Sequence, residues 1–514
     1  MKTVSAPKTN TFVGLFLTTL STLMYEILLT RIFSVTMWYH FAFMSISIAM
    51  FGMTLGALIV YIFPVYFKKE KAHSLLSLSS LIFSLSAVVS FLIHIKIPFY
   101  FELTLRGILS IVVTYIVVSI PFIFSGICVC IALTKFPRYV SKLYAADLAG
   151  AAFGCILLIY TLGYTDGPTS VIIVAIFACL GSIFFSLDNF NSKIMKIAVV
   201  CIVILISFAG VNTFLAREQS PLLRLKWVKG KVEQKPVYVK WNSFSRITVF
   251  DFPGSSWSPT GWGLSTTFPS SLYTVKQLAL LIDADAGTVL TEFNGDLSKL
   301  KHLKYDIVNL VHYLRHNADV LVIGTGGGRD ILSALAFNQK SVVGIEINND
   351  IIYAVNKKFG DFTGHLDRNP KVTFINDEAR SYIARQKRKY DIIQISLIDT
   401  WAATAAGAFV LTENSLYTVE AWKTFLKHLK PNGILTISRW YFKDRPGEIY
   451  RLASLASATL LQMGIKNPRD NILIVKNLPK EQAGGGPDGV GTIIVSKDPF
   501  SGKDITTIKK VVRD

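Results

Sequence analysis

The stretch VLVIGTGGGRD, residues 320–330, decides the fold of the C-terminal half of this chain. A short apolar run leads directly into a loop, 324–328, in which four of five positions are glycine. Such a loop after a buried strand is typical of the first strand-to-helix turn of a doubly wound α/β domain, where the backbone approaches a ligand closely. Arg329 fills the last glycine position of the dinucleotide pattern G-x-G-x-x-G, so that pattern is incomplete.

Glu346 strengthens the prediction of a ligand at this loop. It lies at the end of the next predicted strand, where an acidic side chain accepts hydrogen bonds from ribose hydroxyls in nucleotide-binding sheets. The sequence therefore predicts a nucleoside ligand. No lysine follows the loop as in a Walker motif, which disfavours a triphosphate. A tight turn that binds nothing is the alternative.

The sequence on both sides of the loop predicts further strands and helices. Residues 236–250 alternate apolar and polar side chains around 242–243, which predicts a β-hairpin, and 277–285 predicts another strand. From residue 319 onward, apolar segments of strand length alternate with segments such as 416–430, whose apolar residues recur at helical spacing. This alternation predicts a parallel, doubly wound sheet that binds its ligand at the carboxyl ends of the strands. The strands are expected at 320–324, 341–347, 371–377, 390–398, 433–440, 471–475 and 491–495.

The first 215 residues differ in composition from the rest. The chain of 514 residues is 51% hydrophobic with a mean hydropathy of +0.44, which is high for a soluble protein. The apolar residues are concentrated in seven runs, each near the roughly 20 residues that a helix needs to cross a bilayer. The runs predict a multi-pass helical membrane domain, and Gly52-x-x-x-Gly56 and Gly150-x-x-x-Gly154 predict close helix packing within it. The runs are Thr11–Leu29, Phe41–Phe63, Leu75–Ile95, Gly107–Leu133, Ala145–Leu162, Val171–Leu187 and Ile197–Leu215.

The basic residues between the runs predict an orientation that conflicts with a cytosolic ligand. They follow the second, fourth and sixth runs, at 68–71, 135–142 and 193–196, which predicts that these loops are cytoplasmic. Seven crossings would then place the C-terminal part of the chain outside. We therefore expect that one run does not cross fully, and that the C-terminal domain is cytoplasmic. The stretch Tyr25–Trp38, which two charged residues interrupt, is the one that we expect to be irregular.

Charge and cysteine usage exclude several classes of protein. The net charge of +19 is spread without a dense basic run, and we predict no nucleic-acid partner. All five cysteines lie in the apolar runs, so the C-terminal part has neither a disulfide framework nor a cysteine-based metal site. His312 and His316 lie one turn apart on a predicted helix but lack a third ligand, and we predict no metal.

The order of these motifs resembles the spermidine synthase (polyamine aminopropyltransferase) family, a branch of the class I S-adenosylmethionine-dependent methyltransferase fold. The segments that carry the resemblance are VLVIGTGGGRD, VVGIEINNDIIYAVNKKF, NPKVTFINDEARSYI and KYDIIQISLIDT with LYTVEAWKTFLKHLKPNGIL. YEILLTR and YAADLAGAAFG in the apolar runs further resemble the membrane-fused spermidine-synthase-like proteins of bacteria. The resemblance implies S-adenosylmethionine or decarboxylated S-adenosylmethionine as cofactor. It also implies a location in the bacterial inner (plasma) membrane, with the lipid bilayer as a partner.

The resemblance also implies roles for residues at matching positions. Glu346 matches the acid that binds the ribose, and Asp377 matches the aspartate that reads the adenine amino group. The glycines of the loop would pack on the cofactor. The predicted cofactor-binding residues are Gly324, Gly326, Gly328, Glu346, Asp377 and Glu378.

This chain departs from the family at the positions that serve the reaction. Ser396 stands where the family has an aspartate that helps to deprotonate the attacking amine, Asp399 keeps the second acid, and Thr400 replaces a proline. Gly327 also replaces an aspartate that contacts the cofactor's amino group. Because a serine cannot act as the base at neutral pH, we predict Asp399, together with Ser396, as the catalytic position. A helix-capping or loop role for Asp399 is the alternative.

Two aromatic residues are candidates for the substrate site. Trp401 lies in the segment 400–415, which is rich in small residues and is predicted to cover the site as a lid or wall. Tyr417 follows this segment. A wall of alanines favours a small or apolar acceptor.

Together these patterns predict three parts of the chain. They are a multi-pass α-helical membrane domain at 1–216, a small β domain at 217–318, and a Rossmann-like α/β domain of the methyltransferase type at 319–514. The favoured function is a membrane-anchored transferase of the methyl or aminopropyl type that acts on a small or lipid-associated acceptor; a homodimer is compatible with it. The alternatives are a membrane transporter or sensor that binds the nucleoside cofactor without catalysis, and a degenerate scaffold.

Overall fold

The computed structural model describes residues 6–100, 102–189, 192–251, 258–398, 415–479 and 486–513. The chain forms two compact units. The first contains the residues up to Thr248 together with the short segment Ile282–Asp285. The second contains Val249–Leu281, Ala286–Thr400 and Thr412–Asp514.

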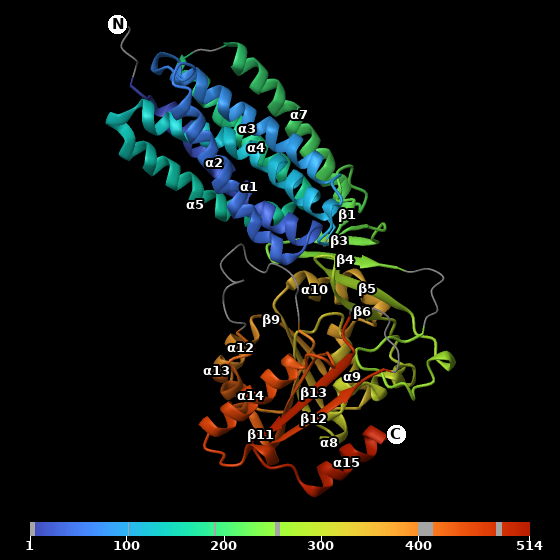
Figure 1. The fold of residues 1–514 in the computed structure, drawn as a ribbon. Coiled ribbons are helices and arrows are strands. Elements are labelled where there is room, and N and C mark those ends of the chain that lie inside the picture. The colour runs from blue at the N-terminus through green and yellow to red at the C-terminus, as the bar shows by residue number, and fades with distance from the viewer. Residues whose placement is uncertain are drawn as a thin grey trace. The chain divides into compact units, whose positions relative to one another are not determined.

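Seven long helices make up most of the first unit (Figure 1). All seven are long and apolar enough to cross a membrane, so the described residues support the predicted number of apolar helices. The helices are α1 (Thr9–Thr36), α2 (Met44–Ile62), α3 (Ala72–His94), α4 (Leu105–Lys135), α5 (Val140–Tyr164), α6 (Gly167–Asn189) and α7 (Ser192–Arg217).

Glycines let these helices approach one another closely. A Cβ atom on Gly56 of α2 would lie 2.3 Å from the backbone oxygen of Ile123 in α4. On α5, a Cβ atom on Gly150 would lie 2.2 Å from the backbone oxygen of Phe16 in α1. Only glycine permits these approaches, so the two Gly-x-x-x-Gly patterns mark helix contacts as predicted.

The irregular stretch that we expected at Tyr25–Trp38 is absent, because α1 continues as a helix through Glu26 and Arg31 to Thr36. The guanidinium of Arg31 donates a hydrogen bond to the backbone oxygen of Phe244, at 2.8 Å. A charged side chain that has a hydrogen-bond partner outside the helix does not need to interrupt the helix. The prediction of an irregular segment was therefore wrong.

Short strands follow the helices. β1 (Trp227–Val228) and β2 (Lys231–Val232) pair antiparallel. A four-stranded sheet has the order β3-β4-β5-β6, formed by β3 (Tyr238–Trp241), β4 (Arg246–Phe250), β5 (Gln277–Ile282) and β6 (Ala286–Thr291). The β3–β4 hairpin is the one predicted around residues 242–243.

Both turns of this sheet use side-chain hydrogen bonds. In the β3–β4 turn, Asn242 Oδ1 accepts hydrogen bonds from the backbone amides of Phe244 and Ser245, both at 2.9 Å. In the β5–β6 turn, the buried Asp283 belongs to the first unit. Its carboxylate accepts a hydrogen bond from Ser34 Oγ in α1, at 2.6 Å, and another from the Arg246 amide, at 2.7 Å.

A seven-stranded sheet organises the second unit, in the order β12-β13-β11-β10-β7-β8-β9. The helices that precede, connect or follow its strands are α8 (Val311–Leu314), α9 (Arg329–Ala336), α10 (Asn349–Tyr353), α11 (Gly360–Thr363), α12 (Ala379–Arg385), α13 (Val419–Lys427), α14 (Gly447–Gln462) and α15 (Gly502–Arg513). The strands are β7 (Asp319–Ile323), β8 (Ser341–Glu346), β9 (Val372–Asn376), β10 (Tyr390–Ser396), β11 (Leu429–Tyr441), β12 (Ile472–Asn477) and β13 (Gly489–Ser496).

The sheet is mixed, which corrects the prediction of a wholly parallel one. The five strands β7 to β11 run parallel to one another, as predicted. β13 pairs antiparallel with both β11 and β12. No helix is described between β12 and β13, so the crossover that makes neighbouring strands parallel does not occur there. The reversal lies at one edge of the sheet and leaves the carboxyl ends of β7 to β10 aligned.

The core of the second unit forms between the sheet and its helices. Leu321, Ile393 and Ile395 on the sheet are fully buried, and so are Trp422 and Phe425 on α13. α13 lies within the segment predicted to be helical from the spacing of its apolar residues. This packing holds β7 and β10 in place, and both strands end at the predicted ligand edge.

Candidate functional site

The glycine loop connects β7 to α9, as the sequence predicts. Gly324, Gly326 and Gly328 have φ values of +74°, +47° and +84°, in the left-handed region that favours glycine. A Cβ atom on Gly327 would lie 2.1 Å from the backbone oxygen of Val289. All four glycines are therefore required by the backbone, three by conformation and one by a close approach.

Glu346, at the end of β8, lies against this loop. Its Oε2 atom accepts a hydrogen bond from the Gly326 amide at 3.2 Å, and its Oε1 atom accepts one from the Asn348 amide at 3.1 Å. The side chain is buried, which raises the pKa of the carboxyl, and these backbone hydrogen bonds oppose the rise. Each oxygen has a second lone pair, so the carboxylate retains acceptor capacity for a ligand.

Asp377 and Glu378 follow β9, the strand next to β8. The Asp377 amide donates to the backbone oxygen of Glu346 at 3.3 Å, so the two strand ends lie side by side. The Asp377 carboxylate pairs with the exposed Arg385 and accepts a hydrogen bond from the Glu378 amide at 2.8 Å. Both of its oxygens thus have partners within the chain. A contact between Asp377 and adenine stays a prediction.

Glu378 forms the N-cap of α12. Its carboxylate accepts hydrogen bonds from the backbone amides of Arg380 and Ser381, at 3.0 Å and 2.7 Å. Burial alone would raise the pKa of this carboxyl, but the hydrogen bonds hold it below its usual range. The capping contacts account for an acid at this position, and its role in cofactor binding stays a prediction.

Ser396 ends β10, and its Oγ atom accepts a hydrogen bond from Gln394 Nε2 at 3.2 Å. Its hydroxyl also acts on the pKa of Asp330, a carboxyl that we did not predict to be part of the site. Asp330 lies in the first turn of α9, directly after the glycine loop, and is 6% exposed. Burial raises the pKa of Asp330 to about 6, and the negative charge of Asp306 adds to the rise. The Ser396 hydroxyl and the positive charge of Arg329 lower the pKa and so act against the rise.

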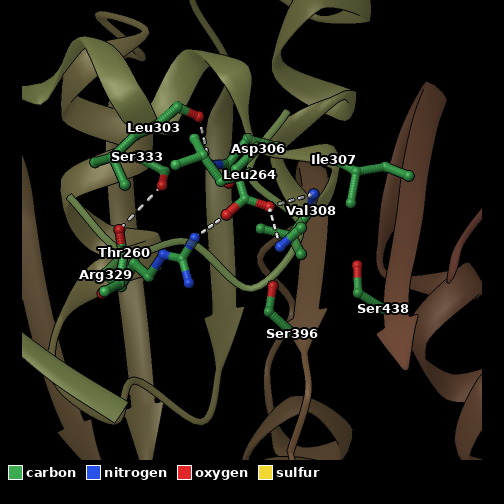
Figure 2. A network of polar contacts seen from close by, with 12 residues as sticks. Thr260, Leu264, Leu303, Asp306, Ile307, Val308, Arg329, Ser333, Ser396 and Ser438 are labelled. Carbon is green, nitrogen blue, oxygen red and sulfur yellow. Dashed lines mark hydrogen bonds and ion pairs between the residues drawn. The ribbon is translucent and has the colours of Figure 1, made fainter. Parts of the chain in front are cut away.

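Asp306 and Arg329 form a buried ion pair (Figure 2). Asp306 Oδ1 accepts hydrogen bonds from the amides of Gly263 and Val308, at 3.1 Å and 3.2 Å. Arg329 lies over the ring of Trp262, with 5.6 Å from the guanidinium carbon to the ring centroid. Figure 2 shows the two charged side chains pointing toward one another near Ser396.

Sequence reasoning missed Asp306, Arg329 and Asp330 as members of one cluster. Their signal was present, because an Arg-Asp pair directly after a glycine loop places two charges where a helix starts in the core. The partners of these residues lie on other elements, and a local sequence pattern does not predict such contacts. The structure brings all three residues to the ends of β7 and β10.

The remaining predicted residues have different outcomes. Asp399 and Trp401 lie outside the described residues, as does most of the predicted lid. The Tyr417 hydroxyl lies 3.4 Å from Arg439 Nη1, and the same guanidinium lies over the Tyr417 ring. The substrate role of Tyr417 stays a prediction.

His312 is a packing residue. It is buried between the amides of Gln394 and Gln339, with ring nitrogens 3.0 Å and 3.2 Å from them. Burial lowers its pKa to about 4, so the ring is neutral at physiological pH. Its hydrogen bonds connect β10, α8 and the segment after α9, and they fix the position of the strand that ends at Ser396.

Residues 301–441 match the model of a protein family, the spermine/spermidine synthase domain. This part of the chain is similar to the spermine/spermidine synthase domain, and we call it the synthase domain. The matched residues run to the end of β11 and include the glycine loop, Glu346, Asp377 and Ser396. The matched residues contain the four segments that carry the resemblance in the C-terminal half of the sequence, and they contain strands β7 to β11.

Solved structures of spermidine synthases are similar to the chain at low identity. A spermidine synthase in complex with the transition state analogue AdoDATO is 17% identical, with a TM-score of 0.36 over 52% of this chain and 76% of that one. Spermidine synthase from Thermotoga maritima is 18% identical, with a TM-score of 0.33 over 52% of this chain and 74% of that one. A probable spermidine synthase from Corynebacterium glutamicum ATCC 13032 is 14% identical, with a TM-score of 0.36 over 55% of this chain and 87% of that one.

Proposed function

We propose that the synthase domain binds S-adenosylmethionine or its decarboxylated form at the carboxyl ends of β7 to β10. There it transfers a group from the sulfonium to a small or lipid-associated acceptor. The observation that carries the proposal is the Glu346 carboxylate, buried and held against the Gly326 amide. A buried carboxylate at the end of the second strand, with acceptor capacity left, fits the two hydroxyls of a ribose.

A second atom in the loop supports a ligand. Thr325 Oγ1 is buried and has no hydrogen-bond partner among the described residues. A buried hydroxyl without a partner costs free energy, and a polar group of a bound ligand would supply the missing hydrogen bond. The donor brings an electrophilic carbon next to a sulfonium. The chain would orient the acceptor in line with that carbon and exclude water.

Calorimetry of the full-length protein in detergent, with each form of the donor, tests the binding. Glu346→Gln should weaken binding by about 1–3 kcal/mol, because hydrogen bonds to the ribose are lost. The control is Glu292→Gln, which alters an exposed carboxylate of the same unit. Equal affinity in wild type and Glu346→Gln would contradict the assignment of Glu346.

We also propose that the seven apolar helices anchor the synthase domain in the plasma membrane of a bacterium. The domain would lie on the cytoplasmic side, where the donor is made. An acceptor dissolved in the bilayer would then reach a tethered enzyme by lateral diffusion. The support is the length and composition of the helices.

A sensor or transporter that binds the nucleoside without catalysis is the second candidate. The observation in its favour is Ser396, a hydroxyl at a position where a carboxylate would act directly as a base. The two functions differ in product. Release of methylthioadenosine or S-adenosylhomocysteine in the presence of amines or a membrane extract supports the transferase, and tight binding without either product supports the sensor.

A further inference from the structure

Helices α6 and α7 enclose a groove that the proposed function does not use. The groove has a volume of about 420 Å³ and is open to the surroundings, and all of its residues belong to the first unit. The α7 residues in its lining recur at intervals of three or four positions, so they lie on one face of the helix. The lining includes Ile173 and Ile176 on α6 and Ile206, Gly210, Thr213 and Arg217 on α7.

A glycine on α7 keeps the groove open. A Cβ atom on Gly210 would meet nothing within 4 Å, whereas one on Gly56 or Gly150 would meet the backbone of a neighbouring helix. Gly210 therefore leaves space that no described side chain fills. The side chains beside it are apolar and face outward, since Ile206 and Phe214 are 53% and 65% exposed. The groove thus presents an apolar surface that requires an apolar partner.

One end of the groove is positively charged. Arg217 is the last residue of α7 and is exposed, and Thr213 places a hydroxyl one turn before it. The segment after the helix lies against the last turns of α7, because the Leu223 amide donates a hydrogen bond to Asn212 Oδ1 at 2.9 Å. Between residues 217 and 226 three basic side chains and one acidic side chain are exposed. An anionic group is therefore favoured at this end, and an apolar chain along the rest of the groove.

The dimensions of the groove fit one extended hydrocarbon chain. From Ile206 to Arg217 an α-helix rises roughly 16 Å, which is about half of the ~30 Å hydrocarbon core of a bilayer. Spread over that length, the 420 Å³ of the groove correspond to a cross-section on the order of 25 Å². An α-helix with a radius of about 5 Å needs on the order of 80 Å². The groove is therefore too narrow to receive a whole transmembrane helix, and it extends over one leaflet.

We propose that this groove binds an anionic phospholipid of the leaflet at which α7 ends. One acyl chain lies along Ile206 and Gly210, and the phosphate contacts Arg217. The inference rests on the proposed membrane anchoring and adds to it a lipid of defined charge and leaflet. It is independent of the proposed transfer reaction.

Native mass spectrometry of the full-length protein, purified in detergent and stripped of lipid, tests the site. The probes are dioleoylphosphatidylglycerol, which is anionic, and dioleoylphosphatidylcholine, which is zwitterionic. We expect one phosphatidylglycerol per chain to bind about fivefold more tightly than phosphatidylcholine, the effect of one charge at a membrane surface. Arg217→Gln should remove this preference. Lys196→Gln is the matched control, since it removes an exposed charge near the other end of α7.

A second pair of variants tests the groove itself. Gly210→Leu fills the open space on α7 and should abolish binding of both lipids at this site. Gly163→Leu on α5 is the matched control, because a Cβ atom on Gly163 also meets nothing within 4 Å. We expect it to bind both lipids as wild type does. Thermal unfolding of the lipid-free samples shows whether the leucine variants fold, and Arg217→Gln decides the question if Gly210→Leu does not.

The outcomes separate this site from the proposals on which it rests. Equal binding of the two lipids by wild type, or the same preference in Arg217→Gln, would overturn the inference. So would unchanged lipid binding in a folded Gly210→Leu variant. A wild-type dimer that is absent in Gly210→Leu would show that a second copy of the chain occupies the groove instead. Recovery of the wild-type chain in the soluble fraction without detergent would contradict the membrane anchoring itself. None of these results alters the donor-binding test of the transferase.

Discussion

At the scale of single residues, Asp306 and Arg329 show how the site combines charge and burial. Their side chains are 0% and 5% exposed. Removing two charges from water is costly, and a buried pair is stable only when its remaining polar groups are satisfied. Two backbone amides contact Asp306 and the ring of Trp262 lies against Arg329, while Arg329 Nε is buried without a hydrogen-bond partner among the described residues. The pair fixes the start of α9, and with it the position of Asp330.

We expect Arg329→Met to be more damaging than removal of both charges. Alone it leaves the Asp306 carboxylate buried without its cation, and the free energy of unfolding should fall by about 3–5 kcal/mol. In Arg329→Met with Asp306→Asn, the amide oxygen still accepts the two backbone hydrogen bonds, and part of the stability should return. Thermal unfolding of the detergent-solubilised proteins measures both. A double variant that is less stable than Arg329→Met would contradict this account.

Asp319, at the start of β7, predicts a dependence of stability on pH. Burial alone would raise its pKa, but hydrogen bonds from Lys430 at 2.5 Å and Ser341 at 2.7 Å, with the charge of Lys430, lower it to about 2. An unfolded aspartate has a pKa of about 3.9. A folded pKa below the unfolded one contributes stability above about pH 4, and this is lost as the pH falls through about 2.

Asp319→Asn should therefore lower the free energy of unfolding at pH 7 by on the order of 2 kcal/mol. The difference from wild type should shrink as the pH is lowered from 4 toward 2. Thermal unfolding across this range measures it, with Glu292→Gln as the exposed control. A difference that stays constant down to pH 2 would show that the carboxylate charge is not the cause.

At the scale of elements, the sequence predicted what depends on local patterns. The strands β7 to β13 and the helix α13 follow from apolar runs and spacing, and Glu346 follows from its place after β8. Strand order is not local, which is why the antiparallel edge formed by β12 and β13 was missed. The continuity of α1 also depends on a distant partner, since Phe244 lies 213 residues after Arg31.

The glycine loop gives a prediction for an element. Gly327→Ala would place a methyl group 2.1 Å from the Val289 oxygen of β6, a backbone atom that cannot turn aside. We expect a loss of about 1–3 kcal/mol in stability and weaker donor binding, because the Gly326 amide must move. Gly447→Ala, at the start of α14, meets nothing within 4 Å and serves as control. Equal stability of the two variants would contradict the assigned close approach.

At the scale of the whole molecule, two arguments about orientation oppose each other. The basic loops after α2, α4 and α6 favour the cytoplasm. If all seven helices cross, the synthase domain then lies on the other side, where the proposed cytosolic donor is absent. We expect the orientation to depart from the one that the loop charges predict, since the proposed catalysis requires the donor.

A fluorescent reporter fused after Asp514 should therefore fold in the cytoplasm. A second reporter, in the loop Pro137–Tyr139 between α4 and α5, gives the side that this loop faces and so tests which helices cross. If all seven helices cross, the loop reporter is periplasmic. If one does not cross, which side the loop faces depends on whether that helix precedes or follows the loop. A reporter after Asp514 that works only in the periplasm would contradict the cytoplasmic location and the enzymatic function together.

The hydrogen bond between Ser34 and Asp283 has a consequence for the order in which the protein is made. The two residues are 249 positions apart, yet both belong to the first unit. A ribosome that has released α1 to α7 has not yet synthesised the turn that hydrogen-bonds the Ser34 end of α1. Part of the second unit is therefore translated before the first unit is complete. A nascent chain stopped before Ile282 carries α1 to α7 but lacks the carboxylate that accepts the Ser34 hydrogen bond.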